Sequence, residues 1–181
     1  MRLYLIRHPR PAVAEGVCYG ATDLPLHEDP GAVAERLRGA VPAGLPVYSS
    51  PLRRCRELAD RLHAEPVRDD RLREMHFGRW EMQRWDALPR TELDAWAADP
   101  LGYAPPGGES PAALQARVAE FIVGLGVSGH TSAVLVTHAG VIKAAHGLLE
   151  PAGSTAWMQL SFGYASVTLL TLPPAERYPA R

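Results

Sequence analysis

The sequence predicts an α/β protein, a three-layer α/β/α sandwich built around a mostly parallel central sheet. Short apolar runs that can form buried strands alternate with longer segments whose apolar residues recur at helical spacing. This alternation is typical of parallel sheets covered by helices on both faces. The 181 residues contain no repeat, linker or block of charge, so we expect one domain over residues 1–181.

The first half of the chain contains two predicted strands and two predicted helices. Residues 3–6 form an unbroken apolar run before a proline-bracketed turn, as expected for a buried parallel strand. In "EDPGAVAERLRGAV", Asp29 is the expected N-cap and Pro30 the first helical residue. A second strand is expected at 45–50, and Ser50 is the expected N-cap of the helix that follows it.

The second half repeats this pattern. The segment "ESPAALQARVAEFIVGL" predicts a helix that begins at Ser110. Residues 132–149 predict a buried strand that leads through a glycine-bearing turn into a helix, and 164–172 predict a last strand. The proline-rich residues after Leu172 are expected to be a frayed end.

Composition and charge exclude several classes of protein. The net charge of −1 provides no field that would attract nucleic acid or an anionic membrane. Cys18 and Cys55 have neither a disulfide framework nor the spacing of a zinc site. No segment approaches the roughly 20 apolar residues that span a bilayer, and the N-terminal apolar run is too short for a signal peptide. We therefore expect a cytoplasmic protein without a metal and without nucleic-acid or membrane partners.

Basic side chains gather where three predicted strands end. Arg7 and His8 follow the first strand, Arg54 lies in the first turn after the second, and His138 follows "AVLVT" directly. In open α/β sheets, ligands bind outside the carboxyl ends of the strands. Two arginines and two histidines at that edge predict an oxyanion pocket, and phosphate matches the arginine fork.

Two histidines in such a pocket can perform different tasks. A neutral imidazole can attack phosphorus, while a protonated one can stabilise charge on the transferring group. Neighbouring guanidinium groups oppose protonation and so favour a neutral nucleophile near pH 7. The leaving oxygen still needs a proton, and Glu74, in a loop with aromatic neighbours, is the best candidate because apolar surroundings favour a protonated carboxyl group.

The motifs carrying these residues resemble a known family. "LIRHPRP" is similar to the RHG signature of the histidine phosphatase superfamily, which includes the cofactor-dependent phosphoglycerate mutases. The blocks "YSSPLRRCRELA", "LREMHFGRWEM", "PPGGES" and "LVTHAGVIKAA" follow in family order over essentially the whole chain. The resemblance implies a phosphoglycerate mutase-like fold and a phosphomonoesterase without metal or organic cofactor. "LREMHFGRWEM" and "GVCYGATDLPL" most resemble the α-ribazole phosphatase branch, which removes a phosphate late in cobalamin assembly.

The resemblance also implies roles for individual residues. His8 matches the histidine that becomes phosphorylated, and Arg7 is its phosphate-binding neighbour. Arg54 matches the second phosphate-binding arginine, His138 the second histidine and Glu74 the proton donor. The implied phosphate-binding set is therefore Arg7, Arg54 and His138.

The chain departs from the family pattern just after the expected nucleophile. The usual RHGE reads RHPR, so Pro9 restricts the following turn and Arg10 adds positive charge beside the pocket. We expect this change to alter substrate preference more than chemistry. Glu109 of "PPGGES" is expected to help start the helix at Ser110 rather than to enter the site.

Residues 75–108 are expected to form a small helical excursion over the site. Trp80, Trp85 and Trp96 are expected to pack this excursion rather than stack on the substrate, a small-molecule phosphate ester. Two alternatives stay open, a phosphoglycerate mutase or a broad-specificity phosphatase. The short segment 80–107 argues against a mutase, because it leaves little room for the capping structure that the resemblance attributes to mutases. A module that only binds phospho-ligands, having lost turnover through RHPR, is the alternative from another class; the sequence predicts no oligomeric state.

Overall fold

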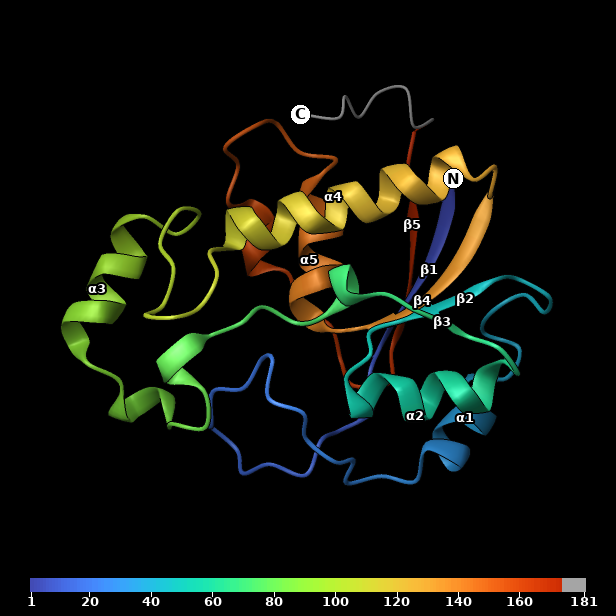
Figure 1. Cartoon of the computed structure of the whole chain (residues 1–181), viewed down its shortest axis with the longest axis horizontal. Coiled ribbons are helices and arrows are strands. Elements are labelled where there is room, and N and C mark those ends of the chain that lie inside the picture. Colours follow the sequence, from blue (N-terminus) through green and yellow to red (C-terminus); the bar gives the residue numbers. More distant parts are fainter. Residues whose placement is uncertain (174–181) are drawn as a thin grey trace.

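One five-stranded mixed sheet forms the centre of the protein (Figure 1). The computed structural model describes residues 1–173. The strands, in the sheet order β3-β2-β4-β1-β5, are β3 (Val67–Arg68), β2 (Val47–Ser49), β4 (Ser132–Thr137), β1 (Arg2–Arg7) and β5 (Val167–Thr171). All neighbouring strands are parallel except β1 and β5. The predicted mostly parallel sheet is confirmed, and its last strand is an antiparallel edge.

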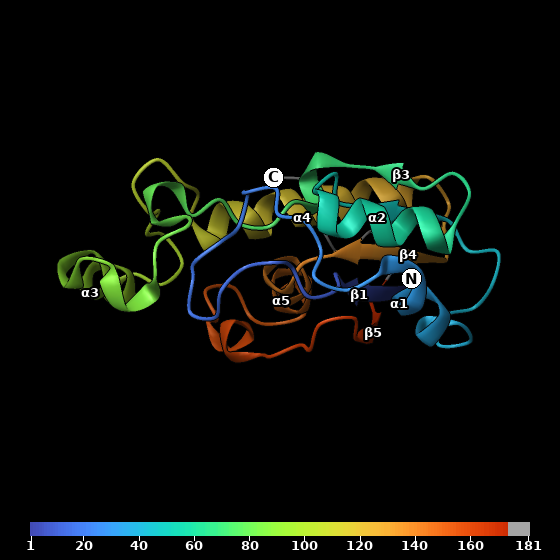
Figure 2. The same ribbon diagram turned by 90° about the horizontal axis from the view of Figure 1, so that it is seen from below.

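Helices cover both faces of this sheet. They are α1 (Pro30–Leu37), α2 (Arg53–Leu62), α4 (Pro111–Val127) and α5 (Ala139–Gly147), and a further helix, α3 (Arg90–Ala98), lies away from the sheet (Figures 1 and 2). Leu3 and Leu5 of β1 belong to the apolar cluster made with α4 and α5, whereas Ile6 belongs to the cluster made with α1 and α2. Because side chains alternate across a strand, β1 contributes to two cores, and the predicted three-layer sandwich is confirmed.

The predicted helix starts are confirmed at two of three positions. Asp29 caps α1, accepting hydrogen bonds from the N–H groups of the first turn, and Ser110 caps α4 by accepting one from Ala113. The prediction for Ser50 is wrong, since α2 begins at Arg53. The Ser50 hydroxyl instead lies within hydrogen-bond distance, 2.8 Å, of Nε2 of His138, the residue that directly follows β4.

A third, smaller apolar cluster lies away from the sheet. It contains the 3₁₀ turns η2 (Gly78–Trp80) and η3 (Trp85–Ala87) together with α3, which lies beyond the end of the sheet in both views (Figures 1 and 2). Its centre is Trp80, only 1% exposed. The tail that the sequence predicts to fray lies almost entirely outside the described residues. Among residues 1–173, no helix is long and apolar enough to cross a membrane.

Candidate active site

The pairing of β1 with β4 brings the two predicted histidines together. The strands are parallel with Arg7 opposite Thr137, so His8 and His138 each stand one residue beyond a paired strand end. The backbone N–H of His8 donates to the Thr137 carbonyl at 2.9 Å. The imidazole rings lie 5.1 Å apart between centroids, and both residues are almost fully buried.

The surroundings of His8 fix its tautomer and its charge. Nδ1 lies 2.7 Å from the carbonyl oxygen of Pro9, which can only accept, so Nδ1 carries the proton and Nε2 keeps its lone pair. Burial, with the charge of Arg54 as the next cause, lowers the pKa of His8 to about 3. This agrees with the expected neutral nucleophile near pH 7, although burial outweighs the arginines as its cause.

His138 is held against the start of α2. Its Nε2 lies 2.8 Å from the hydroxyl of Ser50 and 3.4 Å from Sγ of Cys55. Burial, and then the charge of Arg54, holds the pKa of His138 well below its ordinary value. These surroundings favour a neutral ring, so they do not provide the protonated histidine that the sequence suggested.

Arg7 presents its guanidinium group at the end of β1. Nη1 donates to the carbonyl of Phe162, and Cζ lies 3.8 Å from the centroid of the Tyr164 ring. Its Nε is buried and has no hydrogen-bond partner among the described residues. The guanidinium plane is therefore held by a carbonyl and a ring face, and one N–H donor is unpaired.

Arg54 and Arg53 lie in different surroundings. Arg54 is fully buried; Nη1 donates to the Thr22 carbonyl at 2.8 Å and Nη2 to that of Gly20, while its Nε lacks a partner within the described part of the chain. Arg53 is exposed and pairs with Glu57. Adjacent helical residues point about 100° apart, so only one of the two can face the junction.

Glu74 lies in the irregular connection that leads to η2, and backbone groups hold its carboxylate. Oε1 accepts from the N–H of Met75 at 2.9 Å, and Oε2 accepts from the N–H of Gly140 at 3.1 Å. A Cβ atom at position 140 would stand 2.1 Å from Oε1. The absence of a side chain at Gly140 therefore allows Glu74 to approach the first turn of α5.

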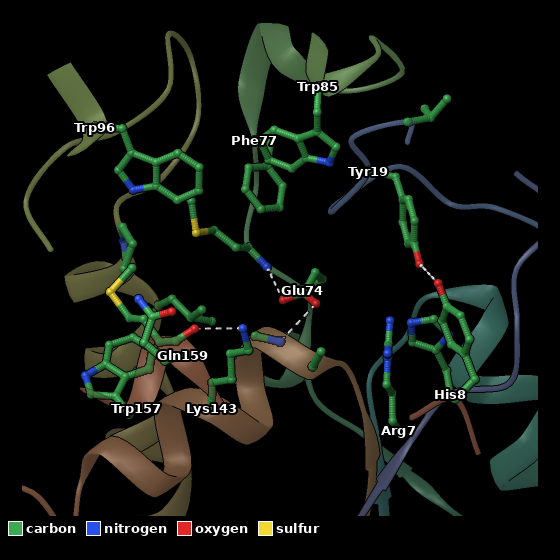
Figure 3. A pocket seen from close by; sticks show the side chains of 18 residues that line it. Arg7, His8, Tyr19, Glu74, Phe77, Trp85, Trp96, Lys143, Trp157 and Gln159 are labelled. Atoms are coloured by element: carbon green, nitrogen blue, oxygen red, sulfur yellow. Dashed lines mark hydrogen bonds between the residues drawn. The ribbon is translucent and has the colours of Figure 1, made fainter. Parts of the chain in front are cut away.

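A cavity of about 460 Å³ joins these groups. Its walls include Arg7, His8 and Tyr19 at one end and Glu74 farther along, and beyond Glu74 it is lined by aromatic, methionine and polar side chains (Figure 3). Trp96, Lys143, Trp157 and Gln159 lie on the side of Glu74 away from His8 (Figure 3), and the lining also includes Met75, Phe77, Trp85 and Met158. Arg54 and His138 are not among the lining residues, so they lie behind the cavity wall rather than in it.

Several lining residues were missed from the sequence. Tyr19 and Tyr164 come from separate loops and join their hydroxyls at 2.8 Å, which only the tertiary fold reveals. Lys143 could have been found, because the helical period places positions 139, 140 and 143 on one face of α5. Trp157 lies on the 3₁₀ turn η4 (Ala156–Gln159), for which the sequence gives no signal.

The structure bears on three further sequence interpretations and corrects the one for Arg10. Trp80, Trp85 and Trp96 pack together in the third cluster, as expected, and Trp85 and Trp96 also line the cavity. Arg10 is exposed and is not a lining residue; its backbone N–H donates to Glu28. Glu109 directly precedes Ser110, the N-cap of α4; it accepts hydrogen bonds from Arg117 and is not among the lining residues, in line with the expectation that it does not enter the site.

The described residues offer no metal centre beside these groups. No group of three or more His, Cys, Asp or Glu side chains in residues 1–173 could hold a metal ion. Cys18 and Cys55 are buried free thiols, and burial raises the pKa of each. The ionisable side chains that line the cavity are those of Arg7, His8, Tyr19, Glu74, Lys143 and Tyr164.

The fold and this cavity define an enzyme that hydrolyses phosphate esters. The chain belongs to the histidine phosphatase superfamily (branch 1), whose family model matches residues 3–178. It is 30% identical over 178 residues to a Hydrogenobacter thermophilus protein provisionally named phosphoserine phosphatase 2, covering 92% of this chain and 87% of the relative.

Solved structures agree with this assignment. The chain is similar to the phosphoglycerate mutase from Thermus thermophilus, with 37% identity and a TM-score of 0.77 over 96% of this chain and 94% of that one. It is also similar to a mycobacterial glucosyl-3-phosphoglycerate phosphatase, with 31% identity and a TM-score of 0.78 over 93% and 88%. The resemblance seen in the sequence motifs is thereby confirmed at the level of the superfamily.

Proposed function

We propose that the protein removes the phosphate of α-ribazole 5′-phosphate, a step in cobalamin assembly, through a phosphohistidine formed at His8. The observation that carries this proposal is the character of the cavity beyond Glu74. In Figure 3, Trp96 and Trp157 flank that end of the cavity. The benzimidazole ring of α-ribazole is flat and apolar, and aromatic walls stabilise such a ring by stacking and by its removal from water.

The reaction divides into two displacements. The phosphate oxygens bind Arg7, and the charge of Arg54 stabilises them from behind the cavity wall. Nε2 of His8 attacks phosphorus as the bond to the leaving oxygen breaks. Glu74 gives its proton to that oxygen, and the alcohol departs. The Glu74 carboxylate then takes a proton from water, which attacks the phosphohistidine, and His8 is released with inorganic phosphate as product.

The position of Glu74 supports this sequence of steps. It lies between the end of the cavity that holds Arg7 and His8 and the aromatic end (Figure 3). A leaving group that extends away from His8 therefore passes the carboxylate. His138 supports the pocket from behind, where its ring meets that of His8 at 5.1 Å.

A second candidate is a phosphatase or mutase for small acids such as phosphoserine or 3-phosphoglycerate. Lys143 favours this candidate, because its side chain lines the cavity. Its cationic Nζ donates one hydrogen bond, 2.8 Å long, to the carbonyl of Met158. The other protons of Nζ can bind a carboxylate. The relatives whose names include phosphoserine or phosphoglycerate point the same way.

A panel of phosphate esters separates the candidates. We expect the highest kcat/KM for α-ribazole 5′-phosphate, compared with O-phosphoserine, 3-phosphoglycerate and phosphohistidine peptides. Trp96→Leu should lower kcat/KM for the α-ribazole ester by about tenfold, the loss expected for one stacking contact, and leave inhibition by inorganic phosphate unchanged. A preference for the acids would establish the second candidate, and binding without turnover of any ester would establish the binding module.

A further inference from the structure

Arg117 of α4 reaches the connection that carries Glu74. Its Nη1 donates to the carbonyl oxygens of Arg71 and Arg73, both at 2.7 Å, and its Nη2 donates to that of Glu74 at 3.2 Å. Residues 73–77 form neither helix nor strand, so no ladder of regular hydrogen bonds fixes this stretch. One guanidinium group therefore anchors two carbonyls of this stretch, those of Arg73 and Glu74, and a third just before it, that of Arg71.

Glu109 secures the other side of Glu74. Its carboxylate accepts from Nε of Arg117 at 3.2 Å and also from Nη2. It further accepts from the N–H of His76 at 3.3 Å, and its own N–H donates to the His76 carbonyl at 2.8 Å. The Arg117 and Glu109 side chains are only 20% and 22% exposed, so water and salt screen the pair less than an open surface pair.

We propose that Arg117 and Glu109 act as positioning residues for Glu74: together they hold the backbone on both sides of it, and thereby set its distance to the leaving oxygen. The inference rests on the proposed role of Glu74 as proton donor. The Glu74 carboxylate is oriented by the N–H groups of Met75 and Gly140, but those bonds form only if the backbone of residue 74 is itself fixed. A displacement of about 1 Å in a catalytic group can lower a rate by about 10².

This role has a signature that a merely structural role lacks. An alkoxide leaves poorly unless it is protonated as the bond breaks, whereas p-nitrophenolate needs little help. Loss of a residue that positions Glu74 should therefore slow the hydrolysis of alkyl phosphates and hardly change that of p-nitrophenyl phosphate. A residue that only stabilises the fold, or one that shapes the phosphate pocket, would affect both esters alike.

The test compares Arg117→Met with the matched control Arg71→Met. Arg71 lies in the same connection, and its side chain pairs with Asp69 rather than with residues 73–76. For Arg117→Met we expect kcat/KM to fall by about 10² for an alkyl phosphate and by less than about fivefold for p-nitrophenyl phosphate. For Arg71→Met we expect the ratio of the two rates to stay that of the wild type. If Arg117→Met does not fold, Glu109→Gln makes the same comparison, because it removes the charge and keeps the shape.

Glu74→Gln distinguishes failure of this proposal from failure of the proposed mechanism. Suppose that Glu74→Gln leaves kcat/KM for p-nitrophenyl phosphate nearly unchanged while Arg117→Met lowers kcat/KM for both esters equally. The positioning role of Arg117 and Glu109 is then overturned, and the assignment of Glu74 as proton donor stands. If Glu74→Gln itself lowers kcat/KM for both esters equally, Glu74 is wrongly assigned as the proton donor, and the positioning role of Arg117 and Glu109 is overturned as well. For the double variant Glu74→Gln/Arg117→Met, we expect kcat/KM for the alkyl phosphate to be no lower than for Glu74→Gln alone. Additive losses of the two substitutions would overturn the proposal.

Discussion

Nδ1 of His8 lies 2.7 Å from the carbonyl oxygen of the next residue, Pro9. The interaction uses the carbonyl group, which proline retains, and not the backbone N–H, which proline lacks. The change from the family's RHGE to RHPR therefore leaves intact the bond that fixes the His8 tautomer. Arg10, the other changed residue, does not line the cavity.

Pro9→Gly should accordingly preserve the chemistry. We expect kcat/KM within about threefold of the wild type, and a free energy of unfolding lower by about 1 kcal/mol because glycine gives the unfolded chain more freedom. Steady-state kinetics together with urea unfolding checks both expectations. A loss of activity comparable to that of His8→Ala would show that the proline ring itself shapes the site.

The burial of His8 predicts an acid-sensitive fold. The pKa of His8 is lowered to about 3 in the folded protein. Between the ordinary histidine pKa of about 6.5 and pH 3, His8 is therefore protonated in the unfolded chain but not in the folded one. The stability associated with neutral His8 is thus fully present above about pH 6.5 and is lost as the pH falls towards 3, by up to about 1.4 kcal/mol per pH unit. Urea unfolding from pH 7 to 4 should give a shallower pH slope for His8→Gln, and parallel slopes would contradict the neutral state of the buried ring.

The sequence predicts those parts of the site that follow from strand ends and helical register. Arg7, His8 and His138 could be located because parallel neighbouring strands end at one edge. Helical register allows only one of Arg53 and Arg54 to face that edge, and the resemblance to the family selects Arg54. By contrast, Tyr164 and Trp157 reach the cavity from irregular segments whose course depends on the packed core. Ser50 shows the same limit: its capping signal is real, yet its hydroxyl is used by a histidine far away in the sequence.

Arg54 and Arg53 should differ strongly when substituted. Arg54→Lys removes the fork that ties the carbonyls of Gly20 and Thr22 and leaves one charge in a fully buried position, so inhibition by inorganic phosphate should weaken by at least about tenfold. Arg53→Ala loses an exposed pair with Glu57, so little change in stability and unaltered phosphate inhibition are expected. Equal effects of the two substitutions would mean that the buried charge of Arg54 does not contribute to phosphate binding.

Gly140→Ala should separate activity from stability. Alanine is favoured over glycine in a helix by about 1 kcal/mol, but the new Cβ would stand 2.1 Å from Oε1 of Glu74 and must displace the carboxylate. We expect an unchanged or higher melting temperature with a markedly lower kcat/KM for an alkyl phosphate. The matched control is Gly124→Ala on α4, where the nearest atom to the new Cβ is 3.9 Å away on Arg71; it should gain stability and keep full activity. Undiminished activity in Gly140→Ala would show that Glu74 need not occupy this position.

Lys143 provides the sharpest distinction between the two candidate substrates. It is the only lysine in the chain, it lines the cavity, and burial lowers its pKa from the ordinary lysine value. A leaving group with a carboxylate, as in 3-phosphoglycerate, can form a charge-assisted hydrogen bond with Nζ, worth about 1.5–3 kcal/mol. α-Ribazole 5′-phosphate has no anionic group other than its phosphate. Lys143→Met should therefore lower kcat/KM for 3-phosphoglycerate by at least about tenfold and leave that for α-ribazole 5′-phosphate within about threefold, while Lys143→Arg should retain both. If the α-ribazole ester loses as much as the acid, Lys143 contacts a group that the two substrates share, and the phosphate itself is the first one to examine.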